Sequence, residues 1–324
     1  MTVPPGPPES PAGSVGAASG LAGWLPESFL SHTRVAWEGA AGREWAHALP
    51  GLVRRACDRW GLRVAGQVMH GANGVAVPVV CEGVPCVLKV AWPDQELQDQ
   101  VLGLRLWSGH GMVRLLEAEL DDGALLLERL DMTCTLRSQP VTEALTVAGE
   151  LLGRLSVPAA RDGEAADGLA TLPTCPEVAD AFLQSADERA AALGHPVPAA
   201  VLAMAQRLAR GLTDVDSDRL LNADLHDENI LAAAREPWLA IDPRVMIGVP
   251  EYGIAQLLWW RLEDIENDLG LRRAFDLLVS VAQLDAELAR AWTIVRSVDY
   301  WLWGRANGLT IDPVRCARVV DGLA

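Results

Sequence analysis

Lysine is almost absent from this 324-residue chain: Lys89 is the single lysine, and the other basic side chains are all arginines. Acidic residues outnumber basic ones by 43 to 27, which gives a formal net charge of −16. This shortage of positive charge argues against a nucleic-acid partner, because phosphate backbones are bound by clustered lysine and arginine. It is compatible with a cationic substrate that is attracted by the negative field of the protein.

The chain also lacks the cysteine patterns of metal sites and the apolar runs of membrane proteins. Its six cysteines form no C-x-x-C pair and no cluster with histidine at zinc-binding spacing. No apolar run approaches the length of a membrane-spanning helix. Residues 1–20 are rich in Pro, Gly and Ser and have neither a basic nor an apolar segment of the kind found in signal peptides. We therefore expect reduced thiols, a cytoplasmic protein without membrane association, and a disordered tail over residues 1–20.

The first part of the chain has the pattern of a small sheet. Helical spacing of apolar residues is found over residues 42–60 and again over residues 94–107. Between them, residues 62–90 alternate β-branched side chains with turns that contain glycine, one of them at Glu82–Gly83. A β-hairpin is expected around residues 121–123. We predict three strands, a helix and two more strands.

The second part is predicted to be mainly helical, with helices at residues 141–156, 176–193 and 198–212 and from Tyr252 to the end. The exception is a polar segment that holds two short apolar runs, residues 230–233 and 238–241. A small sheet followed by a helical region predicts an α+β protein in two lobes. We place a nucleotide-binding lobe at 21–130 and a catalytic and substrate lobe at 131–324.

Three polar residues around those short runs have the spacing of a phosphoryl-transfer site. Asp224 and Asn229 lie five positions apart in "NADLHDENIL", and Asp242 follows in "LAIDP". In kinase-like enzymes one aspartate receives the proton of the acceptor hydroxyl, and an asparagine and a second aspartate bind Mg²⁺. Mg²⁺ prefers oxygen ligands and retains water, so one amide and one carboxylate suffice beside ATP phosphates. For each residue taken alone, a capping or turn role is the stronger explanation, and only the set of three indicates a phosphoryl-transfer site.

The sequence allows two explanations for the presence of a lysine at position 89. A genome rich in G and C favours arginine codons, and a single lysine can survive by chance. Alternatively, the position requires a compact ammonium, which acts as a point charge toward phosphate, whereas arginine presents a planar fork. Lys89 stands in an apolar, strand-like run, "PCVLKVAWP", which is compatible with both.

Five segments resemble the aminoglycoside phosphotransferases, which share the protein-kinase fold, and especially the streptomycin 6-kinase and hydroxyurea-resistance branch. They are "CVLKVAWP", "LGLRLWSGHGMVRLLEAELDDGALLLERL", "LLNADLHDENILAA", "EPWLAIDP" and "GIAQLLWWR". The similarity is colinear and extends over about residues 21 to 310. It implies a bilobal, kinase-like α+β fold, with a small antiparallel sheet in the N-terminal lobe and a larger helical C-terminal lobe.

The resemblance also implies roles for individual residues. Asp224 is the expected catalytic base, Asn229 and Asp242 the expected Mg²⁺ ligands, and Lys89 the residue that binds the ATP phosphates. Gln100 aligns with the glutamate that usually pairs with this lysine, and Glu96, one turn away, is the alternative partner. Backbone groups near Glu128 and Leu130 are expected to meet adenine. The implied substrate is a small cationic or polyhydroxylated molecule such as the aminoglycoside streptomycin, so that the activity confers antibiotic resistance.

Three departures from the family pattern leave alternatives open. Asn222–Ala223 replaces the usual His-Gly before the catalytic aspartate, and alanine cannot adopt a glycine-only backbone conformation cheaply. Gln100 is neutral where a glutamate is usual. Residues 305–307, Arg-Ala-Asn, stand where acidic residues of the substrate pocket are expected. The alternatives are a metabolic or antibiotic-biosynthesis kinase and a pseudokinase that binds nucleotide without turnover. His226 is expected to be a structural hydrogen-bonding residue.

Overall fold

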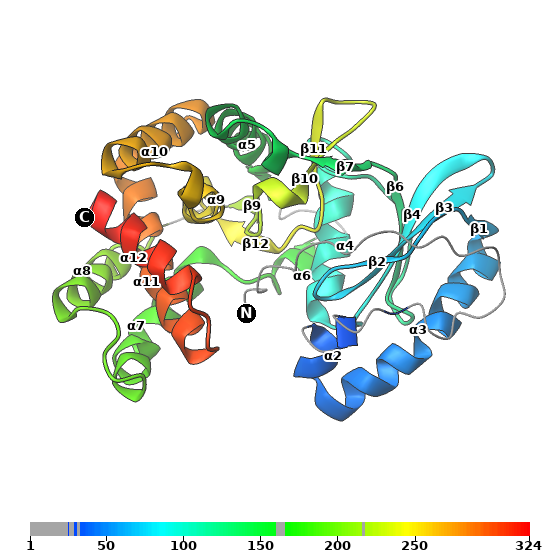
Figure 1. Ribbon diagram of the computed structural model, residues 1–324, viewed down its shortest axis with the longest axis horizontal. Coiled ribbons are helices and arrows are strands. Elements are labelled where there is room, and N and C mark those ends of the chain that lie inside the picture. The colour runs from blue at the N-terminus through cyan, green and yellow to red at the C-terminus, as the bar shows by residue number, and fades with distance from the viewer. Residues whose placement is uncertain (1–24, 26–28, 31–32, 160–165, 216–217) are drawn as a thin grey trace. The chain divides into compact units, whose positions relative to one another are not determined.

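The computed structural model describes residues 25, 29–30, 33–159, 166–215 and 218–324, and it divides into two compact units (Figure 1). Unit 1 comprises Met1–Val101 and Arg114–Arg129, and unit 2 comprises Leu102–Val113 and Leu130–Ala324. The predicted tail over residues 1–20 lies outside the described residues.

Unit 1 is built on one antiparallel sheet with the strand order β1-β3-β4-β6-β5, and β2 pairs with β3. The strands are β1 Leu62–Val64, β2 Met69–His70, β3 Gly74–Cys81, β4 Val84–Ala91, β5 Leu115–Glu119 and β6 Ala124–Glu128. Four strands precede the helix instead of the three predicted, because Met69–His70 forms its own short pairing with β3. The predicted turns are confirmed at Glu82–Gly83, where both residues have positive φ, and between β5 and β6.

Helix α3, Gly39–Trp60, covers one face of this sheet (Figure 1). Its apolar positions, such as Trp45, Leu49 and Val53, are buried against inward-facing residues of β3, β4 and β6. The helix ends where Gly61 adopts a left-handed conformation (φ 61°), which glycine permits without strain. A short helix, α2 at Arg34–Trp37, precedes it, with Thr33 as the N-cap.

Helix α4, Gln95–Trp107, follows β4 and confirms the helix predicted at residues 94–107. Asp94 accepts a hydrogen bond from the backbone N–H of Leu97 at 3.1 Å, as a residue that caps a helix start does.

Unit 2 is mainly helical. Its helices are α5 Val141–Leu155, α6 Ala166–Leu169, α7 Cys175–Ala192, α8 Ala199–Arg210, α9 Ile254–Arg261, α10 Asp268–Ala282, α11 Ala286–Ala306 and α12 Asp312–Leu323. Helix α11 packs against α8 and α12, and α5 packs against α10. Helix α7 begins with a capping box, in which Thr174 and Glu177 bond each other's backbone N–H groups.

Two small antiparallel sheets accompany these helices, in the orders β11-β10-β7 and β12-β9-β8. Their strands are β7 Asp131–Thr135, β8 Val157–Pro158, β9 Arg219–Asn222, β10 Ile230–Ala232, β11 Trp238–Ala240 and β12 Val245–Gly248. The two predicted apolar runs are β10 and β11. A sheet-based unit and a helical unit confirm the predicted α+β class. Within the described residues, no helix combines the length and the apolar character needed to cross a membrane.

Candidate active site

The strands of unit 2 bring Asp224, Asn229 and Asp242 to one region. Strands β9 and β12 pair with Asn222 opposite Val245, so the residue that follows β9 meets the segment that precedes β12. The hairpin of β10 and β11 extends by one further hydrogen bond, from Ile241 N–H to the Asn229 carbonyl at 2.8 Å. Asp242 is the next residue. The backbone pairing therefore gathers the three predicted residues at the ends of these strands.

Asn229 contacts Asp224 directly. Its side-chain Nδ2 donates to the Asp224 backbone carbonyl at 3.2 Å and lies 3.5 Å from the Asp224 carboxylate Oδ2. An amide side chain has one donor end and one acceptor end, so this contact leaves the Asn229 Oδ1 as the group it can offer to a cation. The predicted base and the predicted metal ligand are thus held together by the loop itself.

Asp242 has a left-handed backbone conformation, with φ 49°. Non-glycine residues rarely adopt this conformation, and when they do they are concentrated at functional sites, where surrounding structure holds them in place. Aspartate tolerates it better than most residue types. The conformation turns the chain sharply between β11 and β12.

Asn222, which stands where the family usually has histidine, supports the loop. Its Oδ1 accepts hydrogen bonds from two backbone N–H groups, that of Asp224 at 3.0 Å and that of Arg244 at 3.2 Å. The side chain is buried, and it joins the segment after β9 to the segment before β12. The departure from the family pattern therefore leaves the loop with a hydrogen-bonding residue at this position.

Ala223 does not need a glycine conformation. Its φ lies outside the positive region, and its N–H donates to the Arg244 carbonyl at 2.7 Å. The left-handed conformation that would strain an alanine is therefore absent at this position, which is a turn directly after β9.

The half-buried Asp224 carboxylate has an unusual electrostatic environment. Burial raises its pKa to about 6, and the negative charge of Asp242 acts in the same direction. A hydrogen bond from Gln256 and the positive charges of Arg244 and Arg296 oppose this effect. A carboxylate with this pKa is ionised at pH 7 and is a better proton acceptor than an ordinary aspartate, which suits a general base.

His226 and Asp227, two buried residues of the same loop, contact side chains of other segments. The buried His226 ring stacks on Trp260 with centroids 4.1 Å apart, and burial lowers its pKa to about 4. It is therefore neutral at pH 7, as a structural residue would be. Asp227 is also buried and forms ion pairs with Arg261 at 3.3 Å and Arg137 at 3.5 Å. Burial raises the pKa of Asp227 although both guanidinium groups oppose the shift.

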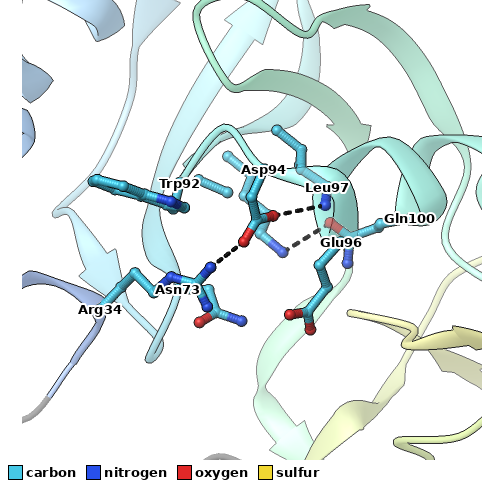
Figure 2. A pocket seen from close by; sticks show the side chains of 9 residues that line it. Arg34, Asn73, Trp92, Asp94, Glu96, Leu97 and Gln100 are labelled. Atoms are coloured by element: carbon cyan, nitrogen blue, oxygen red, sulfur yellow. Dashed lines mark hydrogen bonds and ion pairs between the residues drawn. The ribbon is translucent and has the colours of Figure 1, made fainter. Parts of the chain in front are cut away.

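In unit 1, Lys89 lies in the middle of the sheet. It is half-buried on β4, with Ala76 of β3 and Leu125 of β6 as its cross-strand neighbours. Its Nζ donates to Gln100 Oε1 at 3.1 Å (Figure 2). Gln100 is buried and Glu96 is exposed, and Figure 2 shows the Glu96 carboxylate directed away from Gln100. Of the two candidate partners, the structure brings Gln100 to the lysine.

A pocket surrounds this pair (Figure 2). It contains about 310 Å³ of empty space, which includes open solvent, and three predicted residues, Lys89, Glu96 and Gln100, line it. Asn73, from the turn between β2 and β3, and Arg34 contribute as well. Arg34 forms an ion pair with Asp94 and donates its backbone N–H to the Ala72 carbonyl at 2.9 Å. The pocket thus contains a second, buried cation beside the turn between β2 and β3.

Glu128 and Leu130, the predicted adenine contacts, differ in their surroundings. Glu128 bonds Arg114 twice: its N–H donates to the Arg114 carbonyl at 3.0 Å, and its carboxylate accepts from the Arg114 N–H at 2.8 Å. The Glu128 N–H is therefore already used within the protein. Leu130 is buried, so its side chain is part of a core. The adenine assignment stays a prediction.

Three residues with close contacts at these sites were not predicted from the sequence. They are Arg34 beside the pocket, and Gln256 and Arg296 behind Asp224. A signal exists for the latter two, because Gln256 interrupts the apolar run "GIAQLLWW" and Arg296 stands among apolar residues in "TIVRSV". Polar residues at helix positions that face a core usually have specific partners.

Comparison with known proteins gives matches over most of the chain. A sequence model of the family described as "Aminoglycoside/hydroxyurea antibiotic resistance kinase" matches residues 59–308. A hydroxyurea phosphotransferase of Kitasatospora aureofaciens is 39% identical over 301 residues, which are 91% of this chain and 84% of that protein. A streptomycin 6-kinase of Streptomyces griseus is 39% identical over 294 residues, which are 88% of this chain and 92% of that protein.

Solved structures share the fold at low sequence identity. A thermostable mutant of aminoglycoside phosphotransferase APH(4)-Ia, in a ternary complex with ADP and hygromycin B, superposes with a TM-score of 0.57 at 16% identity, covering 83% of this chain and 97% of that one. Choline kinase LicA of Streptococcus pneumoniae gives a TM-score of 0.54 at 14% identity, covering 85% and 98%. These matches confirm the predicted kinase-like fold.

Proposed function

Because this chain belongs to the aminoglycoside/hydroxyurea antibiotic resistance kinase family and is thus a phosphotransferase, we propose that it transfers the γ-phosphoryl group of ATP to a hydroxyl of a small polar molecule. The observation that carries this proposal is the contact of Asn229 with Asp224 in a loop that adjoins Asp242. This arrangement has the parts that phosphoryl transfer requires: a base, an amide oxygen and a second carboxylate.

The roles follow from the chemistry of each group. Asp224 orients the acceptor hydroxyl and receives its proton. Lys89, held by Gln100, binds the α- and β-phosphates as a point charge. Backbone groups near Glu128 and Leu130 contact adenine. Together these groups position two reactants and stabilise charge, which is most of what catalysis of phosphoryl transfer needs.

Asn229 and Asp242 fit a Mg²⁺ ion that binds together with ATP. Among the described residues, no group of three or more His, Cys, Asp or Glu side chains could hold a metal by itself. One amide oxygen and one carboxylate match the few protein ligands that Mg²⁺ takes when phosphates and water complete its shell. The ion would neutralise phosphate charge during transfer.

We expect ATP to bind tightly only with Mg²⁺ present. Calorimetric titration of ATP should show an affinity reduced by about tenfold or more in chelator, since phosphate charge would then face the carboxylates of this acidic site without a cation. Asp242→Asn should reduce the gain in ATP affinity that Mg²⁺ provides. Equal ATP affinity with Mg²⁺ and with chelator would remove the metal assignment.

We propose an aminoglycoside such as streptomycin as the acceptor, with a role in antibiotic resistance. The acidic net charge of −16 suits a cationic molecule. Hydroxyurea is the second candidate, because a hydroxyurea phosphotransferase is as similar to this chain as a streptomycin 6-kinase, at 39% identity each. The exposed Arg305, at the end of α11 where an acidic residue was expected, also favours a less cationic acceptor.

The pseudokinase alternative loses two of its arguments. Asn222 accepts two backbone hydrogen bonds, and Ala223 does not adopt the positive φ that would require glycine. Gln100 holds Lys89 despite its lack of charge. The replacements at these positions therefore leave each predicted catalytic group with its support.

A compound panel tests the proposed function. The protein is incubated with Mg²⁺·ATP and, separately, streptomycin, hydroxyurea, hygromycin B or choline, and mass spectrometry follows the gain of about 80 Da that one phosphoryl group adds. We expect phosphorylation of streptomycin or hydroxyurea and none without ATP. Binding of ATP with no phosphorylated compound would favour the pseudokinase, and phosphorylation of choline alone would exclude the resistance role.

A further inference from the structure

A buried row of polar groups lies behind Asp224, within unit 2. Gln256 on α9 donates from its Nε2 to Asp224 Oδ1. Arg296 on α11 donates from Nη2 to Gln256 Oε1 at 3.3 Å and from Nη1 to the Tyr252 carbonyl at 2.7 Å. The exposed fractions of Gln256 and Arg296 are 5% and 7%, so both are almost shielded from water.

The order of these groups fixes the direction of the Gln256 amide. A guanidinium has only donors, an ionised carboxylate has only acceptors, and an amide has one end of each kind. With Arg296 on one side and Asp224 on the other, only one orientation of the amide satisfies both neighbours. The reverse orientation would place oxygen against oxygen at Asp224 and nitrogen against nitrogen at Arg296.

Arg296 is itself held firmly. Its guanidinium carbon lies 3.9 Å from the centroid of the Tyr252 ring and 5.3 Å from that of Trp259. Arginine often stacks on aromatic rings, and its planar fork loses little freedom when it bonds two acceptors at once. Arg296 therefore provides a rigid support on α11 for Gln256, which lies on α9.

We propose that Gln256 is a positioning residue for the Asp224 carboxylate and that Arg296 acts through it. This inference rests on the proposed function, which makes Asp224 the base. The Gln256 hydrogen bond engages Oδ1, and the contact to Oδ2 is the longer one from Asn229, at 3.5 Å. Gln256 thus sets the rotation of the carboxylate and leaves Oδ2 as the oxygen that receives the acceptor's proton.

Removal of the positioning group should affect turnover more than binding. A base that rotates freely spends less time in the reactive geometry, whereas nucleotide and acceptor are held by other groups. We expect Gln256→Met, which keeps the side-chain length, to lower kcat about 10- to 100-fold and to change KM for either substrate by less than about threefold.

The test uses Mg²⁺·ATP with whichever of streptomycin and hydroxyurea the native protein phosphorylates. Rates are divided by the number of ATP-binding sites counted by calorimetry, so that loss of folded protein does not count as loss of turnover. Thr293→Val on α11 is the matched control. Thr293 is fully buried and bonds the Ala289 carbonyl one turn away at 2.7 Å, so its replacement should leave kcat within about twofold.

A double-mutant cycle separates positioning from a general effect on packing. If Arg296 acts through Gln256, Arg296→Lys should lower kcat in the native background and have little further effect in Gln256→Met. Additive losses, or a Gln256→Met protein with native kcat, would overturn the inference while Asp224→Asn stayed inactive. An active Asp224→Asn protein would instead overturn the proposed role of Asp224, and the positioning role with it.

Discussion

Asp224→Asn is expected to abolish most phosphoryl transfer while nucleotide binding is retained. Asparagine has nearly the same size, and its Oδ1 can still accept the hydrogen bond from Gln256. It cannot take up the proton of the acceptor hydroxyl. General-base assistance contributes about 10²–10⁴ in rate, so kcat should fall by that factor. KM for ATP should change little, because Lys89, Asn229 and Asp242 are the proposed phosphate and metal contacts.

Two further variants make this result specific. Asp218→Asn applies the same chemical change to an exposed residue next to β9, and it should leave kcat unchanged within about twofold. Asp242→Asn should lower the affinity for Mg²⁺·ATP as well as turnover. Calorimetry with ATP and steady-state kinetics give both quantities. Equal nucleotide-binding defects in Asp224→Asn and Asp242→Asn would mean that the roles of the two aspartates are wrongly divided.

Local patterns predicted most of the architecture. Helical spacing identified α3, α4, α5, α7 and α8 within a few residues, and glycine turns placed the strands of unit 1. These elements are long or bounded by clear turn residues, so local chemistry determines them. The strands β7, β8, β9 and β12 were not specified, because they have two to five residues and depend on partners far away in sequence.

The same distinction, between features set by local sequence and features set by distant partners, applies to the candidate site. Asp224, Asn229 and Asp242 could be found because their spacing reflects a loop and a hairpin that are local in sequence. The choice between Glu96 and Gln100 could not be made, since both have helical spacing and only the tertiary packing of α4 buries one of them. Gln256 reaches Asp224 from 32 positions away in sequence and Arg296 reaches Gln256 from 40 positions away, and no local pattern encodes these contacts.

Lys89→Arg is expected to lose most activity although it keeps the positive charge. The lysine stands on β4 between two paired strands, next to the cross-strand residues Ala76 and Leu125, and its ammonium donates a hydrogen bond to Gln100 at 3.1 Å. A guanidinium is longer and planar, and its rigid fork of five donors cannot take the place of a compact ammonium in the middle of a paired strand. The charge would therefore be displaced from the phosphates. We expect kcat/KM for ATP to fall about 10²-fold, as when one well-placed electrostatic group is removed.

The opposite exchange on the same sheet provides the control. Arg63 is exposed on β1, and Arg63→Lys should have no effect on kinetics, because neither residue type is required there. Steady-state kinetics on both variants decide between the two explanations for the single lysine of the chain. If Lys89→Arg and Arg63→Lys are both as active as the native protein, codon composition accounts for Lys89. A large loss in Lys89→Arg alone means that the pocket requires an ammonium, and that selection kept lysine at this position while arginine served at every other basic position.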